Sequence, residues 1–401
     1  MHEQFEHYAI SDAATINPSL TRTVSLSDEV SFIPMSDVSD TGRWVTRQTR
    51  KYHEVRAGYT AFENGDILFA KIIPCMENGK GCYVDRLVNG VGFGSTEFHV
   101  LRPKPGIDGR FVFYWLQTDM ARKKAETFMI GSAGQQRVQR SFFDHFLVPK
   151  FSLSALRRIA EILDNIDEAI QKTEALIEKL KAMKQGLLHD LLTRGLNENG
   201  KLRDPKTHPE QFKDSPLGRI PNSWDIRSMG NTATLQRGFD LPLHKLKEGD
   251  VAVFGSNGID GFHSNPRVEG PGVITGRTGT IGSVYYSEES YWPLNTTLYV
   301  KDFHGNYPKF VALLLESFGL QRFAAATGVP SLNRNFVHPL IVKVPKREEQ
   351  EGIVAVSDVQ EKRIEIEQES LHKLKLQKKG LMHELLTGKV RVRVTMEESR
   401  C

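Results

Sequence analysis

Residues 179–193, KLKAMKQGLLHDLLT, recur near the end of the chain as residues 373–387, KLKLQKKGLMHELLT. Ten of the fifteen aligned positions are identical, and Leu188 and Asp190 are replaced by the similar Met382 and Glu384. The offset is 194 residues in a chain of 401, so the repeating unit is about half of the protein. Solenoid repeats are only ~20–50 residues long. The recurrence therefore indicates two copies of a much larger unit.

Each copy of the repeat lies at the end of a long stretch with helical periodicity. In residues 151–194 the spacings between apolar residues are three, four or sums of three and four. This pattern predicts one long helix with a single apolar stripe. Ser152 or Ser154 can cap its start, and Gly195 follows its last turn. Residues 347–390 have the same periodicity, although Gln360 and Glu367 thin the apolar face in the middle.

A helix of this length, roughly 60 Å, with one stripe needs a partner surface. The two helices are expected to pair as an antiparallel coiled coil, which would give the chain pseudo-twofold symmetry. The residues expected in this seam, or in contact with a partner, are Ile166, Ile170, Leu180, Leu187, Leu191, Leu374, Leu381 and Leu385.

A globular domain is predicted before each helix. Residues 1–150 and 215–346 both contain short strand-like runs, one helical segment (110–128 and 307–323), a glycine-rich breaker (131–136 and 327–335) and a final short strand. Residues 195–214 are polar and predict a linker, and 391–401 form a tail. The fold class is therefore α+β, with two mixed α/β domains joined by two long helices.

Composition excludes several classes of protein. No apolar run approaches ~18 residues, so no membrane span is expected. The N-terminus lacks a signal-peptide pattern, and only Cys75, Cys82 and Cys401 occur, so a reducing cytoplasm is expected. The histidines have no metal-site spacing, and no P-loop, zinc-protease or methyltransferase tetrapeptide motif is present. These absences favour a chain without catalysis or bound cofactors.

The similarity of the halves is confined to the helices. We infer that the helices bind the same partner twice, whereas the two domains bind two different targets. Twofold DNA-binding proteins contact half-sites about one helical turn apart, or multiples of it. A pair of helices of roughly 60 Å can span such a distance.

Several motifs resemble the specificity (S) subunit of type I restriction–modification enzymes. GLLHDLLTRG (186–195) and GLMHELLTGK (380–389) resemble the helix-ending signature of that family. Pro345, Glu349-Gln350 and Ile353 resemble the start of its helix, and GDILFAK (65–71), GRIPNSWDI (218–226) and GVPSLNR (328–334) resemble its domain motifs. The first half departs from the pattern, because Ala155-Leu156 replace the Glu-Gln pair and no Ile-Pro-x-x-Trp segment precedes its domain.

The resemblance implies a non-catalytic subunit with two target-recognition domains, each specific for one half of a split double-stranded DNA sequence. It implies that the helices dock two modification (methyltransferase) subunits, and it allows for two ATP-driven restriction subunits. S-adenosylmethionine, ATP and Mg²⁺ would then belong to the partner subunits, with no cofactor in this chain.

DNA contacts are expected from basic and amide side chains on loops and breakers. The two domains match at Lys71 and Arg277, and at their breakers. The candidates in the first domain are Arg43, Arg47, Lys71, Gln135, Gln136 and Arg137, and those in the second are Arg277, Asn333, Arg334 and Asn335. Arg122, Lys123 and Lys124 are expected to face phosphate or solvent.

Two other functions fit the same sequence. The alternative to a specificity subunit is a coiled-coil scaffold that joins partners without reading DNA. A nuclease or methyltransferase with unrecognised motifs is the third alternative.

Overall fold

The computed structural model describes residues 6–132, 134–242, 244, 246–325 and 331–393. Residues 327–330 of the second breaker, the tail from residue 394 and Cys401 lie outside these ranges. The chain forms two compact units. Unit 1 comprises Met1–Thr173 and Ser370–Cys401, and unit 2 comprises Glu174–Glu369.

Unit 1 contains two four-stranded sheets. Its elements are β1 (His7–Ala9), α1 (Ile10–Ala13), β2 (Ala14–Ile16), β3 (Glu29–Ile33), β4 (Gln48–Lys51), α2 (Tyr52–Val55), β5 (Thr60–Glu63), β6 (Ile67–Ala70), β7 (Gly81–Tyr83), β8 (Val91–Gly94), β9 (Phe98–Pro103), α3 (Gly109–Leu116), α4 (Asp119–Glu126), β10 (Met129–Ile130), β11 (Arg137–Val138), α5 (Phe142–His145) and β12 (Leu147–Pro149). One sheet has the antiparallel order β2-β9-β6-β7. The other has the order β4-β3-β8-β5, in which β3 and β8 are parallel.

Unit 2 repeats the first of these sheets and differs elsewhere. Its elements are β13 (Phe212–Lys213), β14 (Ile220–Pro221), β15 (Asp225–Ser228), β16 (Thr234–Arg237), β17 (Val251–Gly255), β18 (Gly258–His263), β19 (Gly272–Gly276), β20 (Val284–Ser287), β21 (Trp292–Pro293), β22 (Thr297–Asp302), α7 (Pro308–Ser317), β23 (Ala324–Ala325), β24 (Ser331–Leu332), α8 (Arg334–Val337) and β25 (Ile341–Val344). The sheet β16-β22-β19-β20 matches β2-β9-β6-β7 in order and direction. The three-stranded sheet β18-β17-β21 takes the place of the second sheet of unit 1.

Smaller elements also correspond between the units. The hairpin β23-β24 corresponds to β10-β11, and the pair β15-β25 corresponds to β1-β12. Together with the long helices, this confirms the predicted internal repeat of two mixed α/β domains.

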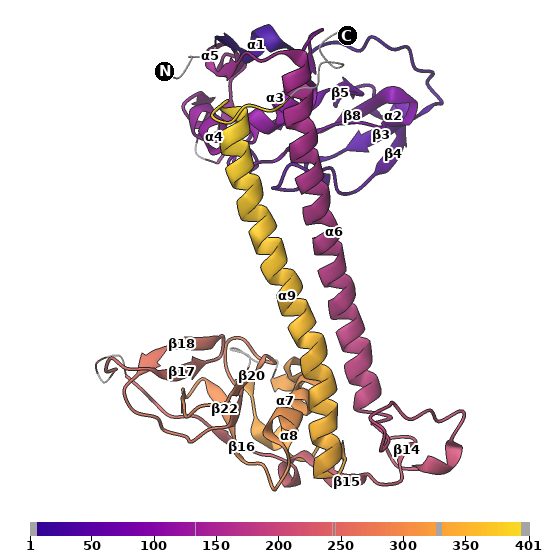
Figure 1. Cartoon of the computed structure of the whole chain (residues 1–401), viewed down its shortest axis with the longest axis vertical. Helices are drawn as coiled ribbons and strands as arrows, with labels where there is room; N and C mark the ends of the chain where they lie inside the picture. Colours follow the sequence, from indigo (N-terminus) through magenta and orange to yellow (C-terminus); the bar gives the residue numbers. More distant parts are fainter. Residues whose placement is uncertain (1–5, 133, 243, 245, 326–330, 394–401) are drawn as a thin grey trace. The chain divides into compact units, whose positions relative to one another are not determined.

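The long helices are α6 (Leu153–Leu191) and α9 (Arg347–Leu386). Within unit 1, the end of α9 packs against the start of α6, because Leu385 and Leu386 share a core with Leu156 and Leu163. Within unit 2, the end of α6 packs against the start of α9 in the same way, and Figure 1 shows the helices side by side in each unit. The contacts inside each unit are therefore antiparallel.

Most of the predicted seam residues are buried. Ile166, Ile170, Leu180, Leu191 and Leu385 have at most 7% of their surface exposed. A second group is only partly buried, namely Leu187, Leu374 and Leu381. Leu188, adjacent to Leu187, is the more buried of that pair. Ser152 caps α6, since its hydroxyl accepts a hydrogen bond from the Ala155 amide at 3.3 Å.

Three details of the sequence-based fold were wrong or incomplete. The single helix expected over 110–128 is two helices, because the Thr118 side chain accepts a hydrogen bond from the Ala121 amide and caps α4 separately. The segment 195–214 is not a wholly solvated linker, since Leu196 and Phe212 are buried. The strands β4, β5 and β8 were not anticipated.

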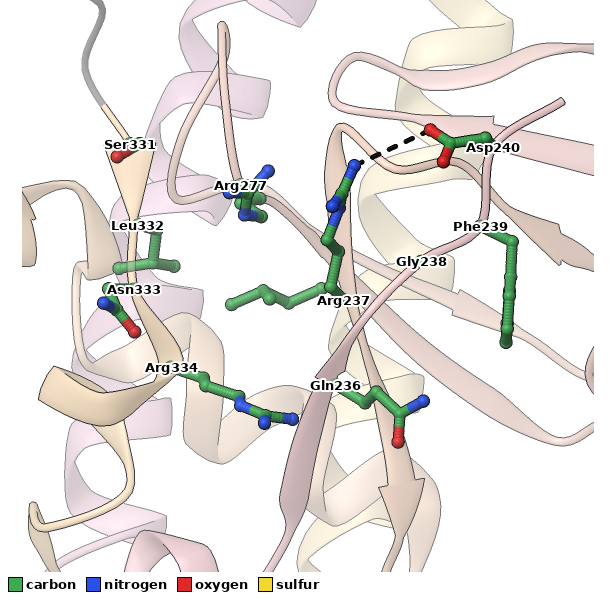
Figure 2. A pocket seen from close by; sticks show the side chains of 11 residues that line it. Gln236, Arg237, Gly238, Phe239, Asp240, Arg277, Ser331, Leu332, Asn333 and Arg334 are labelled. Atoms are coloured by element: carbon green, nitrogen blue, oxygen red, sulfur yellow. Dashed lines mark ion pairs between the residues drawn. The ribbon is translucent and has the colours of Figure 1, made fainter. Parts of the chain in front are cut away.

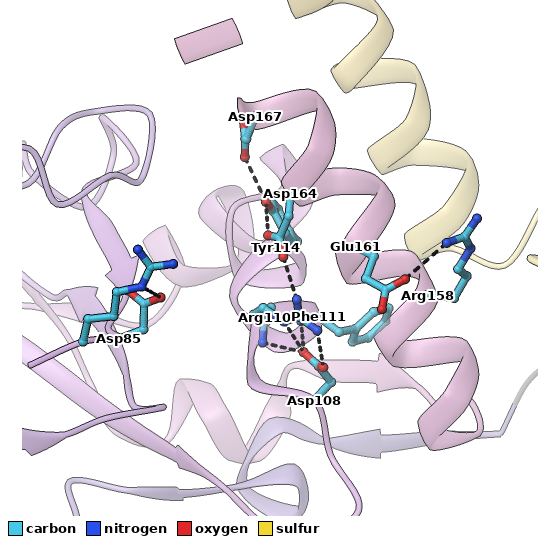
Figure 3. A network of polar contacts seen from close by, with 10 residues as sticks. Asp85, Asp108, Arg110, Phe111, Tyr114, Arg158, Glu161, Asp164 and Asp167 are labelled. Atoms are coloured by element: carbon cyan, nitrogen blue, oxygen red, sulfur yellow. Dashed lines mark hydrogen bonds and ion pairs between the residues drawn. The ribbon is translucent and has the colours of Figure 1, made fainter. Parts of the chain in front are cut away.

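A polar network fixes α3 on α6 within unit 1 (Figure 3). Arg110 pairs with Asp164 at 2.8 Å, and the Tyr114 hydroxyl contacts carboxylate oxygens of Asp164 and Asp167 at 2.8 and 3.0 Å. Lys378 of α9 donates to Asp167 at 2.6 and 2.8 Å. Burial raises the pKa of Tyr114, and the two carboxylates raise it further, so this hydroxyl keeps its proton and acts as a donor.

Replacing Tyr114 by phenylalanine should destabilise unit 1. The change leaves two carboxylates without their shared donor, which costs about 1–3 kcal/mol. Urea denaturation of native and variant chains measures the difference. Tyr8→Phe is the control, because the buried Tyr8 hydroxyl has no hydrogen-bond partner among the described residues and its loss should change little. Equal effects of the two substitutions would contradict a role for the network.

His99 holds β9 against the hairpin β10-β11. Its Nε2 donates to the Val138 carbonyl at 2.9 Å, and its Nδ1 accepts from the Asn17 amide at 3.3 Å. This bonding pattern requires a neutral ring. Burial lowers the pKa of His99 below its usual 6.5, and the charges of Lys71 and Arg140 lower it further.

His99 should make the chain less stable in mild acid. Because its folded pKa is lowered, the unfolded state takes up a proton first as the pH falls below about 6.5, so the stabilisation present above that pH is lost. Thermal midpoints at about pH 7.5 and about pH 5.5 should therefore differ less in His99→Gln than in the native chain. The exposed His244→Gln is the control. It should keep the native pH dependence, and an unchanged dependence in His99→Gln would contradict the assignment.

Candidate nucleic-acid interface

An open hollow of about 590 Å³ lies in unit 2 beside the repeated sheet. We call it hollow 2, and its walls are Gln236, Arg237, Gly238, Phe239, Asp240, Arg277, Leu298, Ser331, Leu332, Asn333 and Arg334. These residues come from the end of β16, the loop after β19, strand β22, and the segment from β24 into α8 (Figure 2). The hollow thus brings together the predicted Arg277, Asn333 and Arg334.

Three guanidinium groups and one carboxylate make hollow 2 electropositive. Arg237 forms a long ion pair with Asp240 at 3.6 Å, and both side chains are more than half exposed. Among the described residues, Arg277 and Arg334 bond only weakly to backbone carbonyls, those of Asn295 and Leu235, both at 3.3 Å. Most of the donors of these arginines therefore remain available to a ligand with acceptor oxygens or nitrogens.

Unit 1 has a hollow at the equivalent place. Its volume is about 250 Å³, and we call it hollow 1. Its walls are Asn17, Pro18, Ser19, Leu20, Thr60, Ala61, Lys71, Phe98 and Val100. The equivalence rests on one backbone bond: the Lys71 carbonyl accepts from the Val138 amide at 2.8 Å, and the Arg277 carbonyl accepts from the Leu332 amide at 2.7 Å. Lys71 and Arg277 thus occupy matching positions, at the end of matching strands.

The same bond corrects the predicted match between the two breakers. Because Val138 corresponds to Leu332, the counterparts of Asn333 and Arg334 are Gln139 and Arg140. The sequence analysis had matched Gln135, Gln136 and Arg137 with the Asn-Arg-Asn run instead. Gln139 and Arg140 are exposed and were missed. Asn333 also caps α8, since its side chain accepts from the Asn335 amide at 2.9 Å.

Arg137 is committed to a partner within the protein. Two of its nitrogens contact the two carboxylate oxygens of Glu97, both at 2.9 Å. The hydrogen bond from Arg137 holds the pKa of Glu97 below its usual value. Gln135 is exposed and Gln136 is half-buried in the turn before it. Neither glutamine lines hollow 1.

Two other predicted arginines of unit 1 lie away from hollow 1. Arg43 is mostly buried, 3.8 Å from Asp167 of α6. Arg47 is half-exposed, with its guanidinium 4.2 Å from the centre of the Trp44 ring and 3.6 Å from Asp85. Neither residue lines hollow 1.

The expectation that Arg122 faces phosphate or solvent was wrong. The side chain is 7% exposed and donates to the carbonyls of Met76 and Gly79 and to Gln117. Burial lowers the pKa of Arg122 to about 10. Arg122 therefore stabilises the loop before β7 by bonding two of its backbone carbonyls.

Gln236 and Arg237 line hollow 2 and were also missed. The signal available in the sequence was an amide and a base at the end of a strand, directly before Gly238. Asn17 occupies the comparable place after β2 and lines hollow 1.

The motifs at the helix boundaries are structural contacts within unit 2. Glu349 accepts from the Leu196 amide at 2.9 Å and pairs with Arg203. Gly195 has φ of +62°, and a Cβ there would meet Glu349 and the buried Trp224 ring within 2.5 Å. Gln350 accepts from the Tyr307 amide and donates to Asn306 and to the Pro345 carbonyl. These motifs therefore join the helix ends to the second domain.

The described ranges contain neither a metal-binding cluster nor a membrane-spanning helix. No group of three or more histidine, cysteine or carboxylate side chains there is placed to hold a metal ion. Nor does any helix in that part of the chain combine the length and apolar character needed to cross a bilayer.

Comparisons with known proteins agree with this architecture. The family model of the type I restriction modification DNA specificity domain matches residues 3–182 and 218–376. The EcoEI type I restriction enzyme specificity subunit of Escherichia coli is 39% identical over 149 residues, which are 37% of this chain and 25% of that protein. The MjaVIII specificity subunit of Methanocaldococcus jannaschii is 22% identical over 321 residues, 72% of this chain and 71% of that protein.

A solved structure has the same fold over almost the whole chain. The S subunit of a type I restriction-modification system from M. genitalium has a TM-score of 0.59 and 16% identity, with 96% of each chain covered. The match to the E. coli relatives spans about a quarter of their length. Because the family model matches two long segments, one in each half, the chain belongs to the family with the type I restriction modification DNA specificity domain.

Proposed function

We propose that this chain is the DNA-reading specificity subunit of a type I restriction–modification complex. The observation that carries the proposal is the pair of equivalent hollows, each with a cation, Lys71 or Arg277, at the end of a matching strand. Residues 1–150 and 215–346 are the two target-recognition domains, and each contacts one half of a split double-stranded target. The unlike walls of the hollows support two different half-sites.

The contacts available in hollow 2 suit base edges as well as phosphates. Arginine pairs with two acceptors of guanine in the major groove, and asparagine or glutamine pairs with adenine. Arg237, Arg277 and Arg334 provide the first kind of group, and Gln236 and Asn333 the second. Hollow 1 offers Lys71 among mostly apolar walls, because the Asn17 side chain is already bonded to His99 and to the Val100 amide. Fewer positively charged side chains therefore contact the half-site bound by unit 1 than the half-site bound by unit 2.

The chain itself supplies no reacting group in this proposal. Its long helices dock two modification subunits, which carry S-adenosylmethionine, and two restriction subunits using ATP and Mg²⁺ can join them in the cytoplasm. The repeated ends of α6 and α9 support twofold docking, because they keep the same outward chemistry. Thr193 donates to the His189 carbonyl and Thr387 to the His383 carbonyl, and both histidines are exposed.

Removing one arginine of hollow 2 should weaken binding at one half-site only. Arg277→Ala or Arg334→Ala should lower affinity about 10- to 100-fold, as expected for loss of one base or phosphate contact. Genome-wide mapping of N6-methyladenine, with the modification subunits co-expressed, first identifies the split target. Gel retardation with the purified partner subunits and with DNA altered in either half then measures each contribution.

Lys71→Ala should give the complementary result at the other half-site. Arg219→Ala is the matched control, because Arg219 is exposed in unit 2 but does not line hollow 2. An equal loss at both half-sites for Arg277→Ala would contradict the assignment. A chain that assembles with its partners but never retards DNA would instead indicate a scaffold.

Polar substitution of both repeat copies should disrupt partner assembly. Leu187 and Leu381 are half-buried at equivalent positions, each packed against the core of its own unit. Leu187→Asn combined with Leu381→Asn should release modification subunits in size-exclusion chromatography, because an apolar contact is lost twice. Met183→Asn with Leu376→Asn, at exposed positions of the same helices, is the control. Normal assembly of the first variant would show that the repeat reflects ancestry only.

A further inference from the structure

An ion pair between the two long helices is present in each unit. In unit 1, Asp167 of α6 binds Lys378 of α9, and both side chains are less than 20% exposed. In unit 2, Lys184 of α6 binds Glu361 of α9. Interhelical pairs of this kind differ from the other ion pairs of the helices, such as Glu178–Lys181 and Lys362–Glu365, which join neighbouring turns of one helix.

The two interhelical pairs are related by the internal repeat. The 194-residue offset of the repeat takes Asp167 to Glu361 and Lys184 to Lys378. The domains are held to the helices by a second related set: Arg110 binds Asp164 in unit 1, and Lys309 binds Asp358 in unit 2 at 3.3 Å. The same offset separates Asp164 from Asp358. The charge arrangement is thus duplicated although the domains around it have diverged.

The pairs are satisfied in only one alignment of the helices. Coiled-coil seams allow alternative alignments that differ by seven residues, because their apolar pattern has that period. If α9 slid by seven residues in one direction, Asp167 would face Leu371 in unit 1. In unit 2, Lys184 would then face Val354 and Glu361 would face Ile177.

Sliding in the other direction is unfavourable for the two carboxylates. Asp167 would then face Leu385, and Glu361 would face Leu191. Both leucines are buried. Lys378 would face Glu174 in this alignment, but the two carboxylates placed against apolar side chains lose their hydration without gaining a partner, so both shifted alignments are disfavoured.

We propose that Asp167–Lys378 and Lys184–Glu361 select the alignment of α6 and α9. In this role they determine the number of base pairs between the two half-sites, a consequence that rests on the proposed function. The apolar stripe alone supplies affinity between the helices, whereas the four charges supply the choice of register. These four residues are positioning residues and touch no DNA.

The direct test measures alignment in the full chain without DNA. Spin labels at Met183→Cys on α6 and Glu348→Cys on α9, two heptads away from the residue that faces Met183, report one interhelical distance within unit 2, in a chain with Cys75→Ser and Cys401→Ser and with Cys82 left buried. The test variant combines Glu361→Lys with Lys378→Glu, which places like charges at both pairs. Its label distances should shift by about 10 Å or become bimodal, since seven helical residues span that length.

The control variant combines Glu365→Lys with Lys373→Glu on the exposed side of α9, with the same change of charge types. It should keep the native distance. Adding Lys184→Glu to the test variant re-forms one interhelical pair and should restore the native distance, which separates lost alignment from lost folding. Unchanged distances in the test variant, equal shifts in the control, or failure of the restoring change would each overturn the proposal.

A second readout tests the consequence for DNA. Methylation mapping with the modification subunits should give an altered gap in the split target for the test variant and the native gap for the control. A moved label distance with an unaltered gap overturns the link between alignment and target spacing. Absence of any methylated split target with the native chain would count against the proposed function alone, because the label measurement does not depend on DNA.

Discussion

The rest of the structure depends on the burial of one apolar stripe on each of two long helices. The helices are 39 and 40 residues long, so the apolar stripe of each extends beyond the domain that precedes it. Neither stripe can therefore be buried only by residues of its own half of the sequence. Each unit solves this with both helices: its core contains the start of one and the end of the other. The last residues of α9 are therefore as much a part of unit 1 as its own sheets.

This arrangement explains which parts of the repeat stayed alike. The ends of α6 and α9 must fit a helix start in the other half of the sequence, so a change in one affects a distant partner. The sheets beside them face fewer such constraints. The strand order β2-β9-β6-β7 and two small strand pairs are retained, while the second sheet of unit 1 is replaced by a smaller one in unit 2. Hollow 1 and hollow 2 can therefore lie at the same position of the repeated sheet and still be lined by different residues.

The elements that could be predicted from sequence are those with a local signal. A 3.6-residue period over some forty residues identifies a helix whatever surrounds it, and Lys71 and Arg277 follow strands that are recognisable from their apolar residues. Strand β4, Gln48–Lys51, has no such signal, because it is a polar edge strand paired with β3. The division of 110–128 depended on a single threonine side chain.

Individual site residues were harder to predict because their partners are distant in sequence. Arg43 binds Asp167, Arg122 closes a loop more than forty residues earlier, and Arg137 binds Glu97. Composition alone does not distinguish these internal arginines from Arg277 and Arg334, whose donors are largely unused within the part of the chain that the structure describes. The distinction is a matter of available acceptors, which only the folded backbone determines.

The same consideration separates the roles of charge in the two kinds of contact. The arginines of hollow 2 are useful because the described residues give them only weak hydrogen-bond partners. A bound ligand can therefore provide the acceptors that these arginines lack. Charges between the helices are useful because each has a partner on the other helix, and both of these ion pairs are lost in every shifted alignment. An apolar pair at Asp167 and Lys378 would bury more surface, but it would stabilise neighbouring alignments nearly as well. Specificity of alignment therefore favours ion pairs at these positions, at some expense of stability.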